Sequence, residues 1–221
     1  MIDPVGEDAM IGPKTSLVAG LASAALLAGC ADDSEGGTPQ PTGAQPPATA
    51  QQPDSALPHS GAPKVDDPID TAVFESDVCG VLTKDQLGSL DMKVRELEPK
   101  PDFAAGPSCT WFLDPVRAGS LGVTFLTANN EGLSNTYAKD KAGAWGLFET
   151  IDPIEGYPAV MADLDDARPD GFCRIEVGIR DDLTFSAGMA ASRDVSPFNA
   201  DPCAAAEKAA ALAIQTMKGG A

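Results

Sequence analysis

Five cysteines carry the clearest chemical signal in this sequence of 221 residues. Four of them, Cys79, Cys109, Cys173 and Cys203, are separated by about thirty, sixty-four and thirty residues. Zinc sites use close pairs such as Cys-x-x-Cys, so this spacing argues against zinc. In an exported chain, four cysteines favour two disulfides, which leave no thiolate nucleophile. Of the three possible pairings we favour Cys79 with Cys203 and Cys109 with Cys173, because the first two begin predicted helices and the other two open predicted strands.

The fifth cysteine, Cys30, is predicted to carry lipid. Residues 27–30 read LAGC, which resembles the bacterial lipobox: an aliphatic residue, two small residues, and the cysteine that becomes the first residue of the mature chain. The preceding apolar stretch, 16–29, has the length of a signal peptide and is too short to span a membrane. We therefore expect residues 1–29 to be a lipoprotein signal peptide. Its first nine residues are acidic where positive charge is usual, so we expect translation to begin at Met10.

The segment that follows Cys30 is predicted to be a tether. Residues 31–68 contain eight prolines and no aromatic residue. Such a segment cannot bury enough apolar surface to offset its loss of conformational entropy. We therefore expect residues 30–68 to be a lipidated, disordered linker. It would hold a folded domain at the outer face of the cytoplasmic membrane, facing the cell wall.

Residues 69–221 are expected to form one folded domain, since all twelve aromatic residues lie between Phe74 and Phe198. Alternating apolar residues predict a hairpin at 173–180 and 183–189 and strands at 109–114 and 120–127, with weaker signals at 92–98 and 158–164. Helices are predicted at 83–90, 132–145 and 201–217, the first beginning with a Thr83–Gln86 capping box and the last ending at two glycines. The expected fold class is α+β: an antiparallel sheet with helices packed on one face and two disulfides.

The sequence offers few groups for catalysis. The single histidine, His59, falls in the predicted tether, so we expect no imidazole in the folded domain and no catalysis of the Ser-His-Asp or Cys-His kind. Phosphate-binding glycine loops are absent. The formal net charge of −18 argues against nucleic acid as a partner, because phosphates are met by clustered lysine and arginine. We expect no cofactor and no enzyme activity.

Two further groups of residues are candidate sites. Asp163, Asp165, Asp166 and Asp170 would suit a calcium ion by type, but the sixth and twelfth positions of an EF-hand loop are arginine here. A solvated acidic loop, with no bound metal, is the favoured interpretation. Three aromatic residues of the segment 145–157 are candidates for a binding groove, although core packing is favoured for two of the three: they are Trp145, Phe148 and Tyr157.

Four cysteine-containing segments together resemble a known family. They read DVCGVLTKDQL, SCTWF, GFCRIEVGI and DPCAAAEKAA, and they follow a lipobox and a low-complexity linker. In this order they resemble the actinobacterial lipoproteins catalogued as domain of unknown function 3558, over nearly the full mature length. Position 81 departs from that pattern, with valine in place of leucine. The resemblance implies a location and a fold, and it assigns no active site.

These observations favour a lipid-anchored, non-enzymatic binding or interaction module of the cell envelope. Its partners are expected to be the membrane, through the lipid on Cys30, and an envelope protein or small ligand whose identity the sequence does not give. Two alternatives remain open at this point. One is a carboxylate-based hydrolase of envelope glycans, which needs two facing carboxyl groups in a cleft. The other is a carrier of an apolar ligand, which needs a sizeable cavity.

Overall fold

The computed structural model describes residues 56–192 and 196–219. The predicted signal peptide, the Met10 start and the lipidated Cys30 lie outside the described residues, as does most of the predicted tether. Within the described ranges, no helix combines the length and the hydropathy that a membrane crossing requires.

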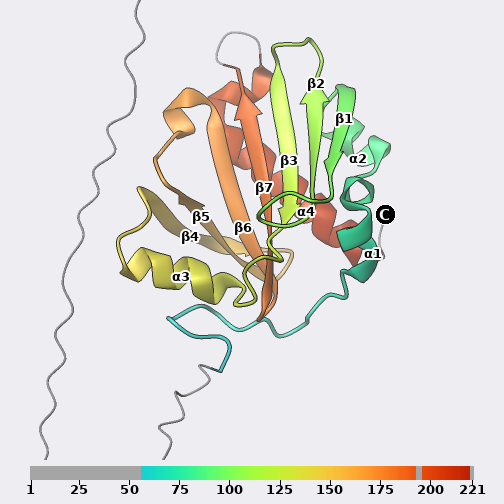
Figure 1. Ribbon diagram of the computed structural model, residues 1–221. Helices are drawn as coiled ribbons and strands as arrows, with labels where there is room; N and C mark the ends of the chain where they lie inside the picture. The colour runs from blue at the N-terminus through green and yellow to red at the C-terminus, as the bar shows by residue number, and fades with distance from the viewer. Residues whose placement is uncertain (1–55, 193–195, 220–221) are drawn as a thin grey trace, which may run out of the picture. The chain divides into compact units, whose positions relative to one another are not determined.

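A seven-stranded antiparallel sheet organises the domain, in the order β1-β2-β3-β7-β6-β5-β4 (Figure 1). The predicted hairpin is β6–β7, and β7 lies between β6 and β3 at the centre of the sheet. The α+β fold and the antiparallel sheet are confirmed. The strands are β1 (Val94–Lys100), β2 (Ser108–Leu113), β3 (Gly119–Phe125), β4 (Leu147–Ile154), β5 (Tyr157–Asp163), β6 (Phe172–Arg180) and β7 (Leu183–Ala191).

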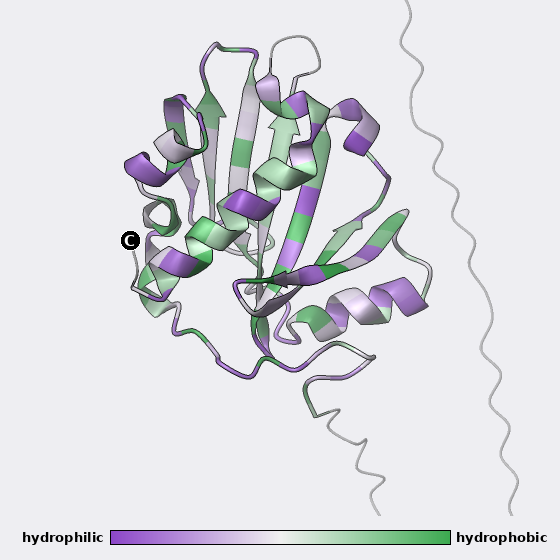
Figure 2. Ribbon diagram, turned by 180° about the vertical axis from the view of Figure 1, so that it is seen from behind, coloured by the Kyte–Doolittle hydropathy of each residue, from purple (hydrophilic) through white to green (hydrophobic). Residues whose placement is uncertain are grey.

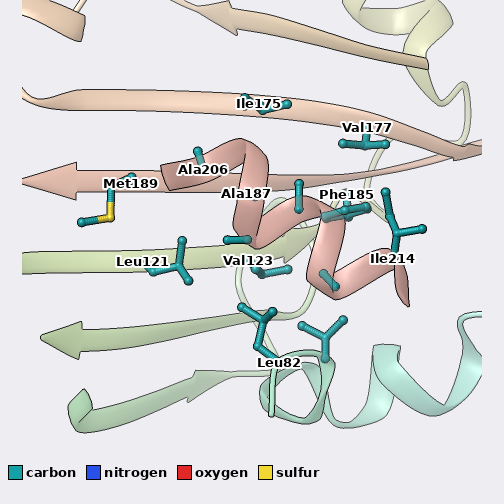
Figure 3. Close-up of a cluster of buried hydrophobic side chains, with 14 of the residues drawn as sticks. Leu82, Leu121, Val123, Ile175, Val177, Phe185, Ala187, Met189, Ala206 and Ile214 are labelled. Carbon is teal, nitrogen blue, oxygen red and sulfur yellow. The ribbon is translucent and has the colours of Figure 1, made fainter. Parts of the chain in front are cut away.

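The C-terminal helix α4 (Pro202–Met217) crosses the back of β6 and β7 (Figure 2). Asp201 caps it, accepting a hydrogen bond from the Ala204 amide at 2.8 Å, and proline occupies its first turn. Its inward face is mostly alanine, which lets the helix lie close to the sheet. Ile214 of α4 joins strand residues such as Phe185 in the main core (Figure 3).

Helix α3 (Leu133–Lys141) packs on the opposite face of the sheet, which corrects the expectation that all helices share one face. On β5, Ala159 and Met161 belong to the core beneath α4, whereas Val160 and Ala162 belong to a second cluster with Leu133 of α3. Successive strand residues point to opposite faces, so β5 is covered on both. The helix ends before Gly143, earlier than the predicted limit at residue 145.

Three short helical segments precede the first strand: α1 (Ala72–Ser76), η1 (Val78–Val81) and α2 (Lys84–Ser89). Of these, η1 packs on the back of β1, β2 and β3. The predicted capping box is confirmed: Thr83 Oγ1 accepts from the Gln86 amide at 3.2 Å, and Gln86 Oε1 accepts from the Thr83 amide at 2.8 Å. Two more 3-10 turns, η2 (Arg168–Asp170) and η3 (Pro197–Ala200), lie before β6 and before α4.

Both disulfides are present, but the favoured pairing was wrong. The bridges join Cys79 to Cys109 and Cys173 to Cys203, with Cα–Cα distances of 5.2 and 5.0 Å. Cys109 lies on β2 and Cys173 on β6, and β3 and β7 separate these strands in the sheet. Three strand spacings amount to about 14 Å, far beyond the reach of a disulfide. Each disulfide instead joins a strand of the sheet to the helical segment that packs on it.

The folded domain also begins before residue 69. The Val65 amide donates to Asp181 Oδ1 at 2.8 Å, and Ala62 and Val65 are buried. The His59 amide donates to Ser134 Oγ at 2.9 Å, so the histidine is part of this domain. The expectation that the domain lacks an imidazole is therefore wrong. The sequence did not indicate this earlier start, because two apolar residues, at 62 and 65, are too few to form a core pattern. In the structure they fill gaps beside α3 and β6.

Candidate functional site

An apolar groove of about 600 Å³ runs between helix α2 and the edge strand β1. These two elements lie side by side at one end of the sheet (Figure 1). The volume falls in the range of about 300–1,000 Å³ that is typical of small-molecule sites. Its lining is Cys79, Leu82, Lys84, Leu87, Gly88, Met92, Lys93, Val94, Leu97 and Trp111.

The groove exists because the sheet is wider than the helical layer behind it. Leu97 pairs with Trp111 across the β1–β2 ladder, and Val94 pairs with Leu113, so all four side chains face the helical side of the sheet. Trp111 is 1% exposed, whereas Leu97 is 48% and Val94 38% exposed. The apolar face of β1 therefore continues the core outward, and the contacts with η1 leave Leu97 and Val94 partly exposed.

The wall opposite β1 is held in place from two sides. The Cys79–Cys109 disulfide fixes η1 to β2 beneath the groove. On α2, the Gln86 side chain donates from Nε2 to Thr216 Oγ1 at 2.9 Å and to the Leu212 carbonyl at 3.2 Å, which ties α2 to α4. These contacts predict a groove that is formed before any ligand arrives.

Among the described residues, the charged side chains that line the groove are two lysines. Lys84 is the first residue of α2, and Lys93 immediately precedes β1. Within the described ranges, neither ammonium group lies within ion-pair distance of a carboxylate. Two lysines without a carboxylate partner are unusual in a chain with 33 acidic and 15 basic residues.

The free edge of β1 is a poor template for another strand. The register of the β1–β2 ladder shifts between Val94 and Glu96, which places a bulge at Arg95. Pro99 has no amide hydrogen to donate, and charged residues line the rest of the strand, including Lys100 with Glu98 at 3.4 Å. Bulges, proline and lysine are the features by which native edge strands resist pairing.

Comparison with known families assigns this architecture. Residues 25–216 match the family model described as "Protein of unknown function (DUF3558)". The chain belongs to this family. The match confirms the resemblance of the cysteine segments to domain of unknown function 3558. Neither the curated proteins nor the solved structures contain a match to this chain.

The three aromatic residues predicted to line a groove in this DUF3558 chain do not share one. Tyr157 is 2% exposed, belongs to the main core and donates its hydroxyl to the Asp67 carbonyl at 2.8 Å. Trp145 and Phe148 pack on the second cluster beneath α3, and Trp145 Nε1 donates to the Thr136 carbonyl at 2.9 Å. Packing accounts for all three.

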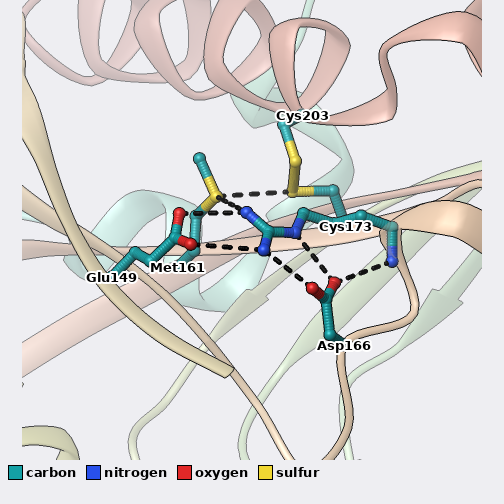
Figure 4. A network of polar contacts seen from close by, with 6 residues as sticks. Glu149, Met161, Asp166, Cys173 and Cys203 are labelled. Atoms are coloured by element: carbon teal, nitrogen blue, oxygen red, sulfur yellow. Dashed lines mark hydrogen bonds and ion pairs between the residues drawn. A yellow bond between two sulfur atoms is a disulfide. The ribbon is translucent and has the colours of Figure 1, made fainter. Parts of the chain in front are cut away.

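In the aspartate-rich loop of the DUF3558 domain, the side chain of Arg168 forms ion pairs with carboxylates. Arg168 Nη2 donates to Asp166 Oδ2 at 2.7 Å, and Arg168 Nη1 donates to Glu149 Oε2 at 2.9 Å, beside Met161 and the Cys173–Cys203 bridge (Figure 4). The hydrogen bonds from Arg168 hold the pKa of Asp166 below its ordinary value. In the part of the chain that the structure describes, no cluster of three or more potential metal ligands occurs.

His59 lies beside the N-terminal end of α3. Its Nδ1 lies 3.1 Å from the hydroxyl of the next residue, Ser60, and its Nε2 lies 4.0 Å from Glu131 Oε2. The hollow beside it, which Pro58 and Ser134 help to line, has no room for a ligand. The imidazole and its neighbours therefore contribute to fixing the N-terminal segment on α3.

Glu176 is a perturbed carboxyl group that the sequence did not reveal. It is 5% exposed on β6, beneath α3, and Thr136 Oγ1 donates to its Oε2 at 2.6 Å. Burial raises its pKa above the ordinary value of a glutamate. In the strand pattern 173–180 it occupies a position predicted to face solvent, so alternation alone could not mark it as buried. Glu176 does not line the α2–β1 groove.

A second hollow, of about 380 Å³, lies on the face of the sheet opposite α4. Its floor is made of small residues such as Ser120, Gly122, Ser186 and Gly188, with Arg174 among the lining residues. The lining of this hollow also includes Phe103 and Phe172, but it exposes more polar and less apolar surface than the α2–β1 groove. The α2–β1 groove is therefore the stronger candidate for a binding site.

Proposed function

We propose that this DUF3558 protein is an exported, lipid-anchored binding module of the cell envelope without enzyme activity, and that the α2–β1 groove is its ligand site. The observation that carries the proposal is the uncovered apolar face of β1, with Leu97 and Val94 exposed beside a wall fixed by a disulfide. Apolar concave sites with a few polar groups are the usual form of ligand pockets.

The location rests on the lipobox at residues 27–30 and on the four cysteines of the folded domain, which are paired as an oxidising compartment favours. Two acyl chains on Cys30 would hold the protein at the membrane, since one chain alone binds only marginally. Of the two alternatives, the groove favours the carrier of an apolar ligand. A glycan hydrolase needs two facing carboxyl groups, and the charged residues that line this groove are both lysines.

The ligand site can be tested with a neutral fluorescent probe such as N-phenyl-1-naphthylamine, whose emission rises in apolar surroundings. The full chain carrying Cys30→Ala avoids the need for detergent. We expect probe binding to weaken about threefold to tenfold in Leu97→Asn, since full burial of a leucine contributes about 1.5–3 kcal/mol and Leu97 is 48% exposed, which leaves about half of it for a ligand to cover. The matched control is Leu164→Asn, which changes another exposed leucine, 67% exposed, away from the groove. Equal binding by the two variants would contradict the proposal.

The anchor is tested separately. In the native host, Cys30→Ala should move the protein from the membrane fraction to the soluble fraction or the medium. Retention of the variant on membranes would contradict lipid anchoring.

A further inference from the structure

We propose that the ligand of the α2–β1 groove is a long-chain carboxylate, with its chain along the apolar face of β1 and its head group at Lys84, Lys93 or both. This inference rests on the proposed function, because it names the ligand class of the same groove. The apolar lining selects a hydrocarbon chain, and the two lysines select an anionic end.

The apolar part of the argument is the area left uncovered along β1. Val94, Leu97, Leu82, Leu87 and Met92 all line the groove, and Trp111 closes its floor. Each methylene removed from water contributes favourably in proportion to its area. A flexible single chain can follow such an open groove along a strand, which a rigid ring system would fill less completely.

The charged part of the argument is the pair of unpartnered lysines. Lys84 is the first residue of α2, whereas Lys93 follows the turn after that helix and immediately precedes β1, so the two lysines come from the two walls of the groove. Among the described residues they are the charged side chains that line the groove, and no described carboxylate lies within ion-pair distance of either. Lysine ammonium groups beside an apolar surface are suited to an anionic head group, while their methylene stems cover the chain.

A polypeptide strand is the competing occupant, and the edge of β1 disfavours it. The bulge at Arg95, the missing amide hydrogen of Pro99 and the charges of Glu96, Glu98 and Lys100 all interrupt the ladder that an added strand would need. A ligand without backbone hydrogen-bonding groups does not need this ladder, so the interrupted edge does not weaken its binding. The structure therefore favours a small amphiphile over a peptide.

The test uses displacement of the same neutral probe from the full chain carrying Cys30→Ala. Dodecanoate and dodecanol have the same chain and differ in the charge of the head group. We expect dodecanoate to displace the probe at concentrations about tenfold lower than dodecanol. In Lys84→Gln/Lys93→Gln this preference should fall to about twofold or less, because each solvent-exposed ion pair contributes about 0.2–1 kcal/mol. Lys141→Gln, on α3 and outside the groove, is the matched control and should keep the full preference.

The outcomes separate this inference from the proposed function. Equal displacement by the acid and the alcohol would overturn the inference, as would a preference that survives in the double lysine variant. Displacement by an extended peptide but by neither amphiphile would also overturn it, and in these cases the groove would remain a binding site. If Leu97→Asn leaves probe binding unchanged, the proposed function fails as well.

Discussion

Removal of the Cys79–Cys109 bridge tests how the disulfides stabilise this domain. The bridge closes a loop of 30 residues, and so does Cys173–Cys203. If a disulfide acts mainly by limiting the unfolded chain, a loop of this length contributes about 3.6 kcal/mol at 25 °C. The double variants Cys79→Ala/Cys109→Ala and Cys173→Ala/Cys203→Ala should therefore lose nearly equal free energies of unfolding, about 3–4 kcal/mol each.

The assay is urea denaturation of the full chain, with tryptophan fluorescence as the signal and the slope of each transition checked against the parent. The nested pairing that the sequence favoured would close loops of 124 and 64 residues. Those loops would contribute about 4.9 and 4.3 kcal/mol, too close to the present values for stability alone to decide the pairing. Peptide mapping without reduction decides it, because Cys79→Ala should free the thiol of Cys109 and leave Cys173–Cys203 intact.

Two results would refute this reasoning. A free Cys203 in the Cys79→Ala variant would show that the bridges do not connect neighbours in sequence. A difference of more than about 2 kcal/mol between the two double variants would show that native packing, and not loop length, sets the contribution of each bridge. Only the first bridge lies beneath the groove, so loss of Cys79–Cys109 should also weaken binding of the neutral probe, while loss of the other bridge should not.

Three other substitutions follow from single contacts. The folded-state pKa of Glu176 is raised, so its stabilising effect is present below the unfolded pKa and is lost as pH rises through the folded pKa. In urea unfolding, the stability of Glu176→Gln relative to the parent should therefore increase as the pH rises above about 4.5, the ordinary pKa of a glutamate; an equal pH dependence in both proteins would contradict this. Thr83→Ala removes the side chain that caps α2 and should cost about 1 kcal/mol, measured as a lower midpoint, while an unchanged midpoint would show that the cap contributes nothing. Gly119 has φ +116°, and an added Cβ would meet the Ala190 carbonyl, so Gly119→Ala should lower the melting temperature by several degrees or more; a neutral effect would be the refuting result.

The strands that the sequence revealed are those in which apolar and more polar residues alternate. In β6, Cys173, Ile175 and Val177 are buried as predicted, but Glu176, on the other face, is buried as well. The sequence contained no signal for strand β4, because only two of its eight residues are buried and its charged and apolar residues do not alternate. As an edge strand, β4 gains its place from pairing with β5, which a local pattern does not record.

The disulfide pairing and the groove depended on the order of strands in space. Cys109 and Cys173 both open strands, and the sequence contains no sign that β3 and β7 lie between them. The groove needed a further fact, that the helical segments leave part of β1 exposed. The segment 92–98 was predicted only as a weaker strand. Val94 and Leu97 share one face because of the register shift between Val94 and Glu96, which a local pattern does not record.

The open face of β1 admits two explanations, and they differ in what polar substitution does. If the exposure only marks the margin of a sheet wider than its helical layer, Leu97→Asn should change the binding of no ligand. If a ligand completes the core there, the same change should weaken binding, while it lowers the free energy of unfolding without ligand by only about 1 kcal/mol, because about half of this side chain, 48% exposed, is buried on folding. The blunted edge, the fixed wall of α2 and the two unpaired lysines favour the second explanation, since a mere margin requires none of them. Added dodecanoate should then raise the melting temperature of the parent chain by more than that of Leu97→Asn, as linkage between binding and folding requires.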